Sequence, residues 1–327
     1  MQTKHQHASG FGGAKAPISP AMQEIYDRAV PAAGGRGRLV TLRCGARVHL
    51  IEAGDGPPVV HLHGTSTSGL SHLSLIEHMP DVHSIAVDRP GAGLSDPVIL
   101  PARRYRDAVV EVMDDLMDTL GLPKATLVGA SGGGAWALWY ALARPGRVHR
   151  LALLGATPLL PGTRTPLPMR IMTTPALGDL LARLFRPTRA GVIRFMRIVG
   201  EGDTIVRHQD LLDSLVAAQT DPVLARATRA EFRVFLTPFA LGGMRPSMRF
   251  RPEELHHLRV PTLLVWGARD PLGGKDVARS IAAMIPTARV EVLDTGHVPW
   301  LGRTEEVSRL LSDFAREDVT SSPLPSS

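Results

Sequence analysis

The chain has 327 residues, an ordinary share of apolar residues and a formal net charge of +6, which suits one large α/β domain or a domain with a sizeable insertion. Its basic residues are spread along the sequence and mixed with acidic ones, so the charge indicates a solvated surface and not a nucleic-acid or membrane-binding patch. A single cysteine excludes an intramolecular disulfide, and neither a signal peptide nor a membrane-spanning apolar run is found, so we expect a cytoplasmic protein.

The two ends of the chain have the composition of loose tails. Residues 1–36 are rich in Gly, Ala, Pro and polar residues, and we expect a flexible N-terminal tail with at most a short helix at Met22–Ala29. Residues 317–327 read EDVTSSPLPSS, which predicts a disordered C-terminal tail.

Between the tails, short apolar runs alternate with longer segments of helical periodicity. The runs are mostly continuous stretches of aliphatic residues, which is typical of parallel strands buried on both faces. In the segment Tyr105–Leu120, Val109, Val112 and Leu116 recur at helical spacing. This alternation predicts an α/β fold with a mostly parallel eight-stranded sheet and helices on both faces. The expected strands are Leu39–Arg43, Val48–Ala53, Val59–Leu62, Ser84–Val87, Ala125–Val128, Leu151–Leu154, Thr262–Trp266 and Val290–Leu293.

The segment 157–258 breaks this alternation, because it contains no convincing strand. It opens with the proline-rich sequence TPLLPGTRTPLP and continues with helical patterns, and Asp221-Pro222 is a favourable helix start. We therefore expect a helical insertion here, within one domain whose core is formed by 37–156 and 259–316.

Four glycines surround one serine in the sequence LVGASGGGAW, which joins an expected strand to an expected helix. A dinucleotide-binding loop is one such junction, but the glycine spacing is wrong and no acidic residue ends the next strand. Gly129 to Gly133 instead fits the Gly-x-Ser-x-Gly nucleophile elbow, in which a sharp turn lifts the Ser131 hydroxyl clear of the sheet. A side chain at Gly129 or Gly133 would clash there, and Gly132 would supply a backbone N–H to a developing oxyanion.

Two further residues follow expected strands where a serine nucleophile needs its partners. A serine hydroxyl requires a base to take its proton, and the base requires an orienting carboxylate. Asp270 lies just after one buried strand and His297 just after the next, which gives the chain order serine, acid, histidine. Upstream, His63-Gly64 ends another strand, and the backbone N–H of Thr65 is the expected second oxyanion donor.

These motifs resemble those of the α/β-hydrolase fold family, in the branch that holds esterases, C–C bond hydrolases and epoxide hydrolases. The resemblance covers about residues 39–316. The motifs that carry it are HG at 63–64, DRPGAGLSD at 88–96, the serine motif, WGARDP at 266–271 and GHVPW at 296–300. The resemblance implies that Ser131 is the nucleophile, His297 the base and Asp270 the orienting acid, and that 157–258 is a cap.

The sequence also departs from many members of that family. After the His-Gly pair it has TSTSG in place of a bulky residue and a Pro-Gly pair, so a hydroxyl there could contact the oxyanion or the substrate, or cap the helix expected at Gly69–Met79. The nucleophile is serine and not aspartate, which argues against epoxide hydrolase and dehalogenase chemistry. We expect first a serine hydrolase of the carboxylesterase kind, which cleaves an ester or related acyl bond. The alternatives are a C–C bond hydrolase or a biosynthetic acyl transferase or cyclase, and a non-catalytic ligand-binding protein.

The expected partner is a small-molecule substrate with an apolar portion. Most Met and Phe residues of the cap are expected in its own core, and the candidates for lining the pocket are Phe232, Phe235, Met172 and Trp300. Arginines of the cap could meet an anionic substrate, but a solvated face is the simpler interpretation.

Metal and cofactor binding find no support in the sequence. His61 and the pair His256-His257 have no acidic or thiol partners at metal-ligand spacing, so neither a metal nor another cofactor is expected. The sequence leaves the oligomeric state open.

Overall fold

The computed structural model describes Lys15 and residues 17–98, 100–174, 176–184, 186–236 and 243–317, apart from the side chains at 172, 173, 179, 182 and 183. Eight strands form one sheet in the order β1-β2-β4-β3-β5-β6-β7-β8. Strand β2 is antiparallel to both of its neighbours and the remaining pairs are parallel. All eight expected strands are confirmed, although the first begins at Arg36 and not at Leu39. The strands are β1 (Arg36–Thr41), β2 (Arg47–Ala53), β3 (Pro58–Leu62), β4 (His83–Val87), β5 (Ala125–Ala130), β6 (Val148–Leu154), β7 (Thr262–Gly267) and β8 (Ala288–Leu293).

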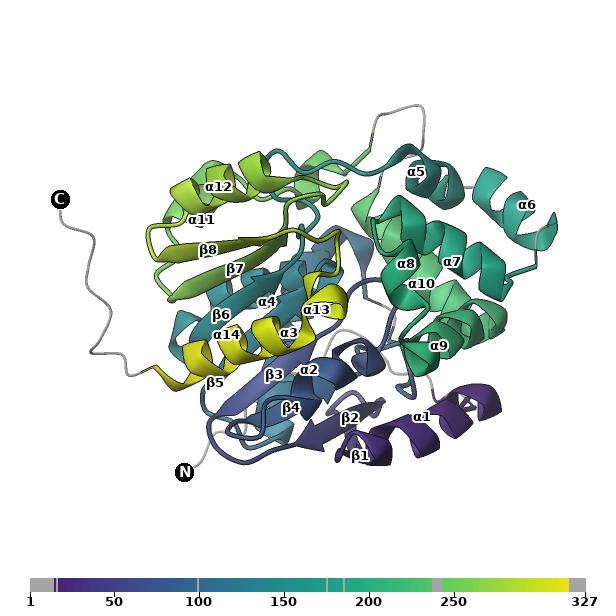
Figure 1. Ribbon diagram of the computed structural model, residues 1–327, viewed down its shortest axis with the longest axis horizontal. Coiled ribbons are helices and arrows are strands. Elements are labelled where there is room, and N and C mark those ends of the chain that lie inside the picture. The colour runs from purple at the N-terminus through teal and green to yellow at the C-terminus, as the bar shows by residue number, and fades with distance from the viewer. Residues whose placement is uncertain are drawn as a thin grey trace, which may run out of the picture.

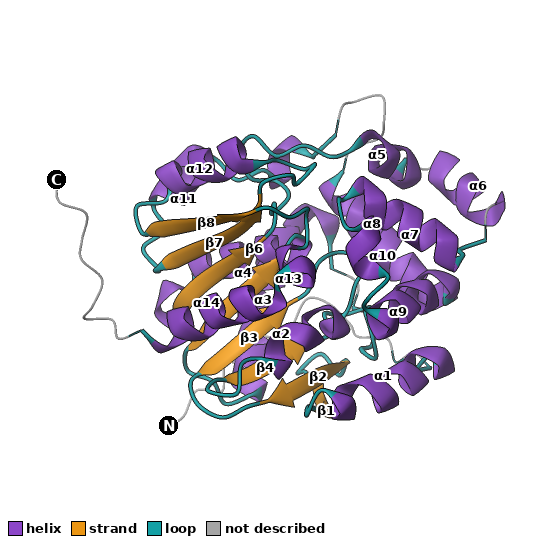
Figure 2. Ribbon diagram, in the orientation of Figure 1, coloured by secondary structure: helices purple, strands orange, loops and turns teal. Residues whose placement is uncertain are grey.

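Helices cover both faces of this sheet (Figures 1 and 2). The main covering helices are α2 (Leu73–Glu77), α3 (Tyr105–Thr119), α4 (Gly132–Ala143), α12 (Lys275–Met284) and α14 (Thr304–Arg316). Successive side chains of a strand point to opposite faces. On β5, Leu127 packs into the apolar cluster that contains α3, α4 and α12, and the next residue, Val128, packs into the cluster that contains α2 and α14. Burial on both faces explains why the central strands read as continuous apolar runs, whereas the edge strands β1 and β8 are mostly exposed or only partly buried.

The N-terminal segment differs from the expected tail. Helix α1 (Pro20–Ala32) is longer than the short helix expected there, and its apolar face packs against β2, the start of α2 and the cap. The Tyr26 hydroxyl also donates a hydrogen bond to the buried carboxylate of Asp88 (2.6 Å). The expectation of a flexible tail over residues 1–36 is therefore wrong from Pro20 onward. Residues 1–14 of the expected N-terminal tail and residues 318–327 of the expected C-terminal tail lie outside the described residues.

The expected helical insertion is confirmed between β6 and β7. Its helices are α5 (Leu167–Thr173), α6 (Leu177–Leu184), α7 (Arg189–Ile198), α8 (Gly202–Ile205), α9 (Gln209–Thr220), α10 (Pro222–Phe235) and α11 (Pro252–His256). Helix α10 begins as the sequence predicts, because the Asp221 carboxylate accepts the backbone N–H groups of Val223 (2.8 Å) and Leu224 (3.0 Å). Helices α5 to α10 gather at one end of the sheet (Figure 1). We refer to residues 157–258 as the cap.

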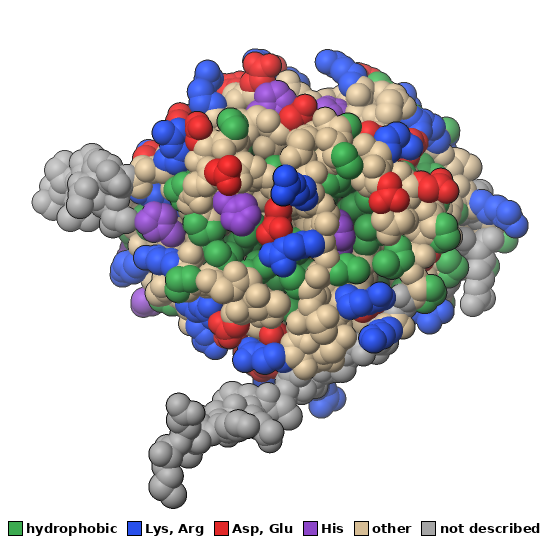
Figure 3. All heavy atoms as spheres, turned by 90° about the horizontal axis from the view of Figure 1, so that it is seen from below, with side chains coloured by type: hydrophobic (Ala, Val, Ile, Leu, Met, Phe, Trp, Pro, Cys, Tyr) green, Lys and Arg blue, Asp and Glu red, His purple; other side chains and the backbone are tan. Residues whose placement is uncertain are grey.

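The surface carries charges of both signs side by side. On the face shown in Figure 3, Lys and Arg side chains are interspersed with Asp and Glu, which agrees with the interpretation of the net charge as a solvated surface. Among the described residues, no helix has both the length and the apolar character that crossing a bilayer requires.

Candidate active site

Ser131 lies in the tight turn that joins β5 to α4. Its backbone has φ +47° and ψ −116°, a region that residues other than glycine rarely occupy, so the surrounding structure must hold it there. The Ser131 N–H donates to the Leu154 carbonyl on β6 (3.2 Å), and its own carbonyl accepts the N–H of Gly134 (2.9 Å). The serine side chain lines a cavity beneath the cap.

The neighbouring glycines permit this turn by lacking a side chain. A Cβ on Gly129 would lie 2.6 Å from the Cα of Gly134, and a Cβ on Gly133 would lie 2.5 Å from the carbonyl oxygen of His63 and overlap that of Leu62. The former contact is with the start of α4 and the latter with the end of β3. The interpretation of Gly129 and Gly133 from the sequence is therefore confirmed, because a Cβ at either position would clash with backbone.

Gly133→Ala is expected to destabilise the protein by about 3 kcal/mol or more, because the backbone of β3 cannot move away from the added methyl group. The matched control is Gly146→Ala, since a Cβ at Gly146 would meet nothing within 4 Å. Thermal unfolding and soluble yield measure the difference. Equal melting temperatures for the two variants would contradict the close packing of the β3 backbone against Gly133.

His297 and Asp270 form a hydrogen-bonded pair beside this turn. His297 Nδ1 lies 2.8 Å from Asp270 Oδ2. The same carboxylate accepts the backbone N–H of Ala156 at Oδ2 (2.8 Å) and that of Leu272 at Oδ1 (2.9 Å). Asp270 follows β7 and His297 follows β8, as the sequence predicts. Three donors thus fix an acid that is 3% exposed, and this fixed acid sets the orientation of the imidazole.

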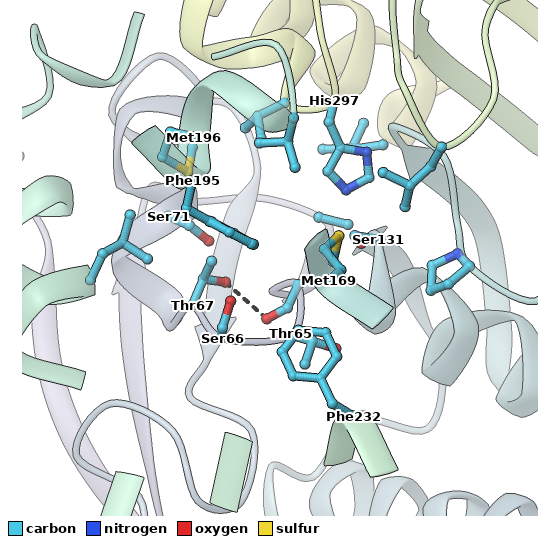
Figure 4. Close-up of a pocket in the computed structure, with 18 of the residues that line it drawn as sticks. Thr65, Ser66, Thr67, Ser71, Ser131, Met169, Phe195, Met196, Phe232 and His297 are labelled. Atoms are coloured by element: carbon cyan, nitrogen blue, oxygen red, sulfur yellow. Dashed lines mark hydrogen bonds between the residues drawn. The ribbon is translucent and has the colours of Figure 1, made fainter. Parts of the chain in front are cut away.

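The imidazole of His297 faces the cavity that Ser131 lines (Figure 4). Burial lowers the pKa of His297, but the charge of Asp270, its hydrogen bond and the charge of Glu201 outweigh burial and raise the pKa above its ordinary value. The imidazole therefore binds a proton more tightly in this site than it would in water. This property suits a group that accepts a proton.

Thr65 and Gly132 lie against each other next to Ser131. A Cβ on Gly132 would lie 3.2 Å from the backbone nitrogen of Thr65 and overlap the Thr65 hydroxyl. Gly132 is the first residue of α4, and an N–H in the first turn of a helix has no acceptor within the helix. The two backbone N–H groups proposed from the sequence as oxyanion donors are thus brought to one place.

A neutral histidine fixes the loop that carries Thr65. His63 Nε2 accepts the backbone N–H of Arg89 (2.9 Å), so its ring proton is on Nδ1, which donates to the Gly64 carbonyl (2.8 Å). Burial above all, together with the charge of Arg89, places the pKa of His63 well below its ordinary value. The Thr67 hydroxyl donates to the same Gly64 carbonyl (2.9 Å). Within the TSTSG stretch, the Thr67 side chain therefore ties the loop back to Gly64.

The cavity between the core and the cap has a volume of about 110 Å³. Phe232, Phe235 and Trp300 line it as expected, whereas the side chain of Met172 lies outside the described residues. Phe235 is also packed edge-on against the ring of Tyr105, so it has a structural role as well. Further lining residues come mainly from cap helices α5, α7 and α9 and include Leu211 and Leu215. Three others, Met169, Phe195 and Met196, are labelled in Figure 4. The described lining is apolar except for Ser131, His297, other hydroxyl groups and one amide.

A second cavity of about 480 Å³ lies on the other side of Ser66 and Thr67, which line both cavities. Its wall includes Arg89 and Glu231, whose side chains form an ion pair that joins the core to cap helix α10. The Arg89 guanidinium also donates to the His63 carbonyl (2.9 Å) and lies over the Trp136 ring (5.0 Å). This pair was not predicted, because an acid 142 positions away carries no local signal.

Sequence analysis also missed Glu201, which lies in the cap at the backbone of the His297 loop. Its signal in the sequence is an acidic residue between two glycines, which is equally typical of an exposed turn. In the part of the chain that the structure describes, no group of three or more His, Cys, Asp or Glu residues could hold a metal ion.

Comparison with known proteins identifies the class of this protein. The family model for the alpha/beta hydrolase fold matches residues 57–303, and the chain belongs to that family. The chain is also similar to enzymes with more specific names. The chain is 28% identical over 291 residues to a 2-hydroxy-6-oxononadienedioate/2-hydroxy-6-oxononatrienedioate hydrolase of Cupriavidus pinatubonensis, which covers 86% of this chain and 95% of the relative.

Two further similar proteins carry different substrate names. A 2-hydroxy-6-oxo-6-phenylhexa-2,4-dienoate hydrolase of Comamonas testosteroni is 27% identical over 83% of this chain and 91% of its own length. The crystal structure of carboxylesterase CesB from Bacillus subtilis superposes with a TM-score of 0.72 and 21% identity over 91% of this chain and 98% of that one. The latter similarity shows the fold alone.

Proposed function

We propose that the protein is a serine hydrolase in which Ser131, His297 and Asp270 act as nucleophile, base and orienting acid. The observation that carries the proposal is the convergence at one cavity of a strained serine turn and a histidine held by a buried carboxylate. Asp270 occupies Nδ1 of the imidazole, which leaves Nε2 to accept the proton of the serine hydroxyl. The non-catalytic alternative does not account for the strain maintained at Ser131.

The reaction then proceeds in two halves. Ser131 Oγ attacks the substrate carbonyl while His297 takes its proton, and the N–H groups of Gly132 and Thr65 stabilise the oxyanion. Collapse of this intermediate breaks the bond to the leaving group, which receives the proton from His297. Water, deprotonated in turn by His297, attacks the acyl-enzyme and releases the acid, which restores the free serine.

For the bond that is cleaved, we propose a C–C bond in a 2-hydroxy-6-oxo-dienoate. This is the alternative of the sequence analysis, and it takes precedence over ester cleavage because relatives matched over nearly their whole length carry such names. Cleavage of a C–C bond needs a leaving carbon whose electron pair can be delocalised, and the conjugated system of such a compound meets that need. His297 then protonates carbon where an ester would require protonation of oxygen.

For the group on the reacting carbonyl, we propose an uncharged apolar substituent. The dioate of the Cupriavidus relative's name carries two carboxylates, whereas the described lining of the catalytic cavity contains no Lys or Arg. Burying an unpaired carboxylate among Leu, Met and Phe side chains would cost several kcal/mol. A phenyl or alkyl group at this position, as in the Comamonas relative's name, fits the lining better. The single remaining carboxylate would lie toward the hydroxyls of Ser66 and Thr67.

Ester cleavage is the second candidate, because the same lack of a cation provides no strong partner for the remaining carboxylate. Two substrate series separate the candidates: 2-hydroxy-6-oxo-6-phenylhexa-2,4-dienoate and its 6-alkyl analogues, and p-nitrophenyl esters of increasing acyl length. We expect kcat/KM for the 6-phenyl compound to exceed that for every ester. The reverse order would establish an esterase, and inactivity on both series together with no fluorophosphonate labelling would remove the hydrolase proposal.

Phe232→Ala is expected to shift preference toward bulkier acyl groups, because Phe232 lines the catalytic cavity and is only partly buried. Removing a ring from a pocket wall changes discrimination by about 1–3 kcal/mol, or roughly 10- to 200-fold in relative kcat/KM. The matched control on the same helix is Val234→Ala, since Val234 lines the second cavity. An equal shift in both variants would show that Phe232 does not select the acyl group.

A further inference from the structure

The cap contacts the loop that carries His297 through one turn, Val199–Glu201, between α7 and α8. The His297 N–H donates to the Val199 carbonyl (2.9 Å), and the Val298 N–H donates to Glu201 Oε1 (2.9 Å). The two backbones are in close contact, because a Cβ on Gly296 would lie 2.7 Å from both Glu201 Oε1 and the Gly200 carbonyl. The cap therefore holds the base through its backbone on both sides of its side chain.

The acid in this turn is 2% exposed, although a buried carboxylate is costly unless its charge is compensated. Its carboxylate accepts the Val298 N–H and the Thr204 hydroxyl, and among the described residues no Lys or Arg lies within ion-pair distance of it. The charged groups that interact with it electrostatically are His297, Asp270 and Arg269. Arg269 is largely exposed and pairs with Asp294. The cation best placed to compensate Glu201 is therefore the protonated imidazole of His297.

We propose that Glu201 is a positioning residue of the cap that orients the His297 loop through the Val298 N–H and adds a second negative charge, besides that of Asp270, to stabilise the imidazolium formed when Ser131 loses its proton. This inference rests on the proposed role of His297 as base. It assigns a part of the base's charge environment to the cap, from which the sequence analysis expected only residues that line the substrate pocket. Removal of the carboxylate charge then weakens catalysis without removing any of the three groups that perform it.

The electrostatic coupling of the two groups works in both directions. The charge of Glu201 contributes to the raised pKa of His297. Burial raises the pKa of Glu201, while the hydrogen bonds from Val298 and Thr204 and the charge of His297 oppose that rise. Neutralising either group thus destabilises the charge on the other, so a loss of the Glu201 charge lowers the pKa of His297.

Glu201→Gln separates the charge from the hydrogen bond, since the amide oxygen still accepts the Val298 N–H. The probe is the second-order rate of Ser131 labelling by a fluorophosphonate as a function of pH, which requires no knowledge of the natural substrate. We expect labelling to rise through one ionisation as His297 becomes neutral, and this rising limb to lie at lower pH in Glu201→Gln. At the plateau the labelling rate should fall on the order of tenfold, because the developing imidazolium has lost one stabilising charge.

Two further variants make the test specific. Glu201→Asp keeps the charge but shortens the reach to Val298, so we expect a lower rate with the rising limb where the wild type has it. Asp203→Asn removes an exposed charge from the next helical turn and should change neither quantity. Thermal unfolding of each variant verifies that the fold is kept.

A rising limb in Glu201→Gln that superimposes on that of the wild type would overturn the proposal, and so would an equal displacement in Asp203→Asn or Glu201→Asp. Failure of the hydrolase proposal gives a different result, since the wild type itself would then not be labelled at Ser131.

Discussion

Ser131→Ala is expected to lower kcat by about 10⁴- to 10⁶-fold while the protein remains folded, the loss typical of a removed serine nucleophile. Ser131 and His297 line the same cavity, and Gly132, the residue after the serine, lies against Thr65. A methyl group cannot form the acyl-enzyme. What activity remains reflects binding and oxyanion stabilisation of a direct attack by water, which is far slower.

Ser131→Gly provides a second test, because this variant should also be inactive but should be more stable than Ser131→Ala. The φ of +47° strains serine and alanine alike but suits glycine, so Ser131→Gly should be inactive and about 1 kcal/mol more stable than Ser131→Ala. Steady-state kinetics and thermal unfolding of the three proteins measure both effects. Turnover near that of the wild type in either purified variant would exclude the serine mechanism.

The central strands of the sheet could be predicted from the sequence because they are buried on both faces, as β3, β5 and β7 show. On β5, Leu127 and Val128 enter different apolar clusters, so both faces of the strand need apolar side chains and alternation with polar residues is not required. The cap was predicted for the opposite reason: about a hundred residues between two strands contain no such apolar run. Periodicity and turn residues are local properties, and both of these inferences depend on them alone.

The chain order of the candidate triad was equally local, because each member directly follows a strand. Asp270 and His297 end neighbouring strands, so the sheet brings them together once the strand order is fixed. Glu201 follows a cap helix whose orientation on the core is set by tertiary packing, and the pairing of Arg89 with Glu231 depends on the same packing. No periodicity in the sequence encodes how a cap is placed over a sheet, so these contacts required the structure.

Helix α1 shows that amino-acid composition alone can lead to a wrong prediction. Its buried residues, among them Met22, Ile25 and Tyr26, do recur at helical spacing. The Gly- and Ala-rich residues around them made the segment read as a tail, and the surfaces that cover its apolar face come from β2, α2 and the cap. A single amphipathic helix at a chain end is stable only when its apolar face packs against such a surface. The sequence of the helix does not indicate which part of the chain provides that surface.

Asp270→Asn is expected to lower kcat by roughly 10⁴-fold, even though the side chain keeps its shape. The Asp270 carboxylate accepts from three donors, His297 Nδ1, the Ala156 N–H and the Leu272 N–H. An amide group has one accepting and one donating end. If its NH₂ faces His297, it also opposes the Ala156 N–H, and the imidazole must present Nδ1 as an acceptor. The proton then sits on Nε2, which can no longer take the proton of Ser131.

The opposite orientation of the introduced amide avoids that tautomer but sets its NH₂ against the Leu272 N–H, and it still lacks the negative charge that stabilises the imidazolium. Either orientation leaves at least one buried donor without an acceptor, which costs about 1–3 kcal/mol of stability. Asp294→Asn is the matched control, because Asp294 is 71% exposed near the same loop and forms an ion pair with the exposed Arg269. The pair is compared by kcat and by thermal unfolding. Asp270→Asn with kcat within tenfold of Asp294→Asn would mean that another group orients His297, and Glu201 would then be the residue to replace next.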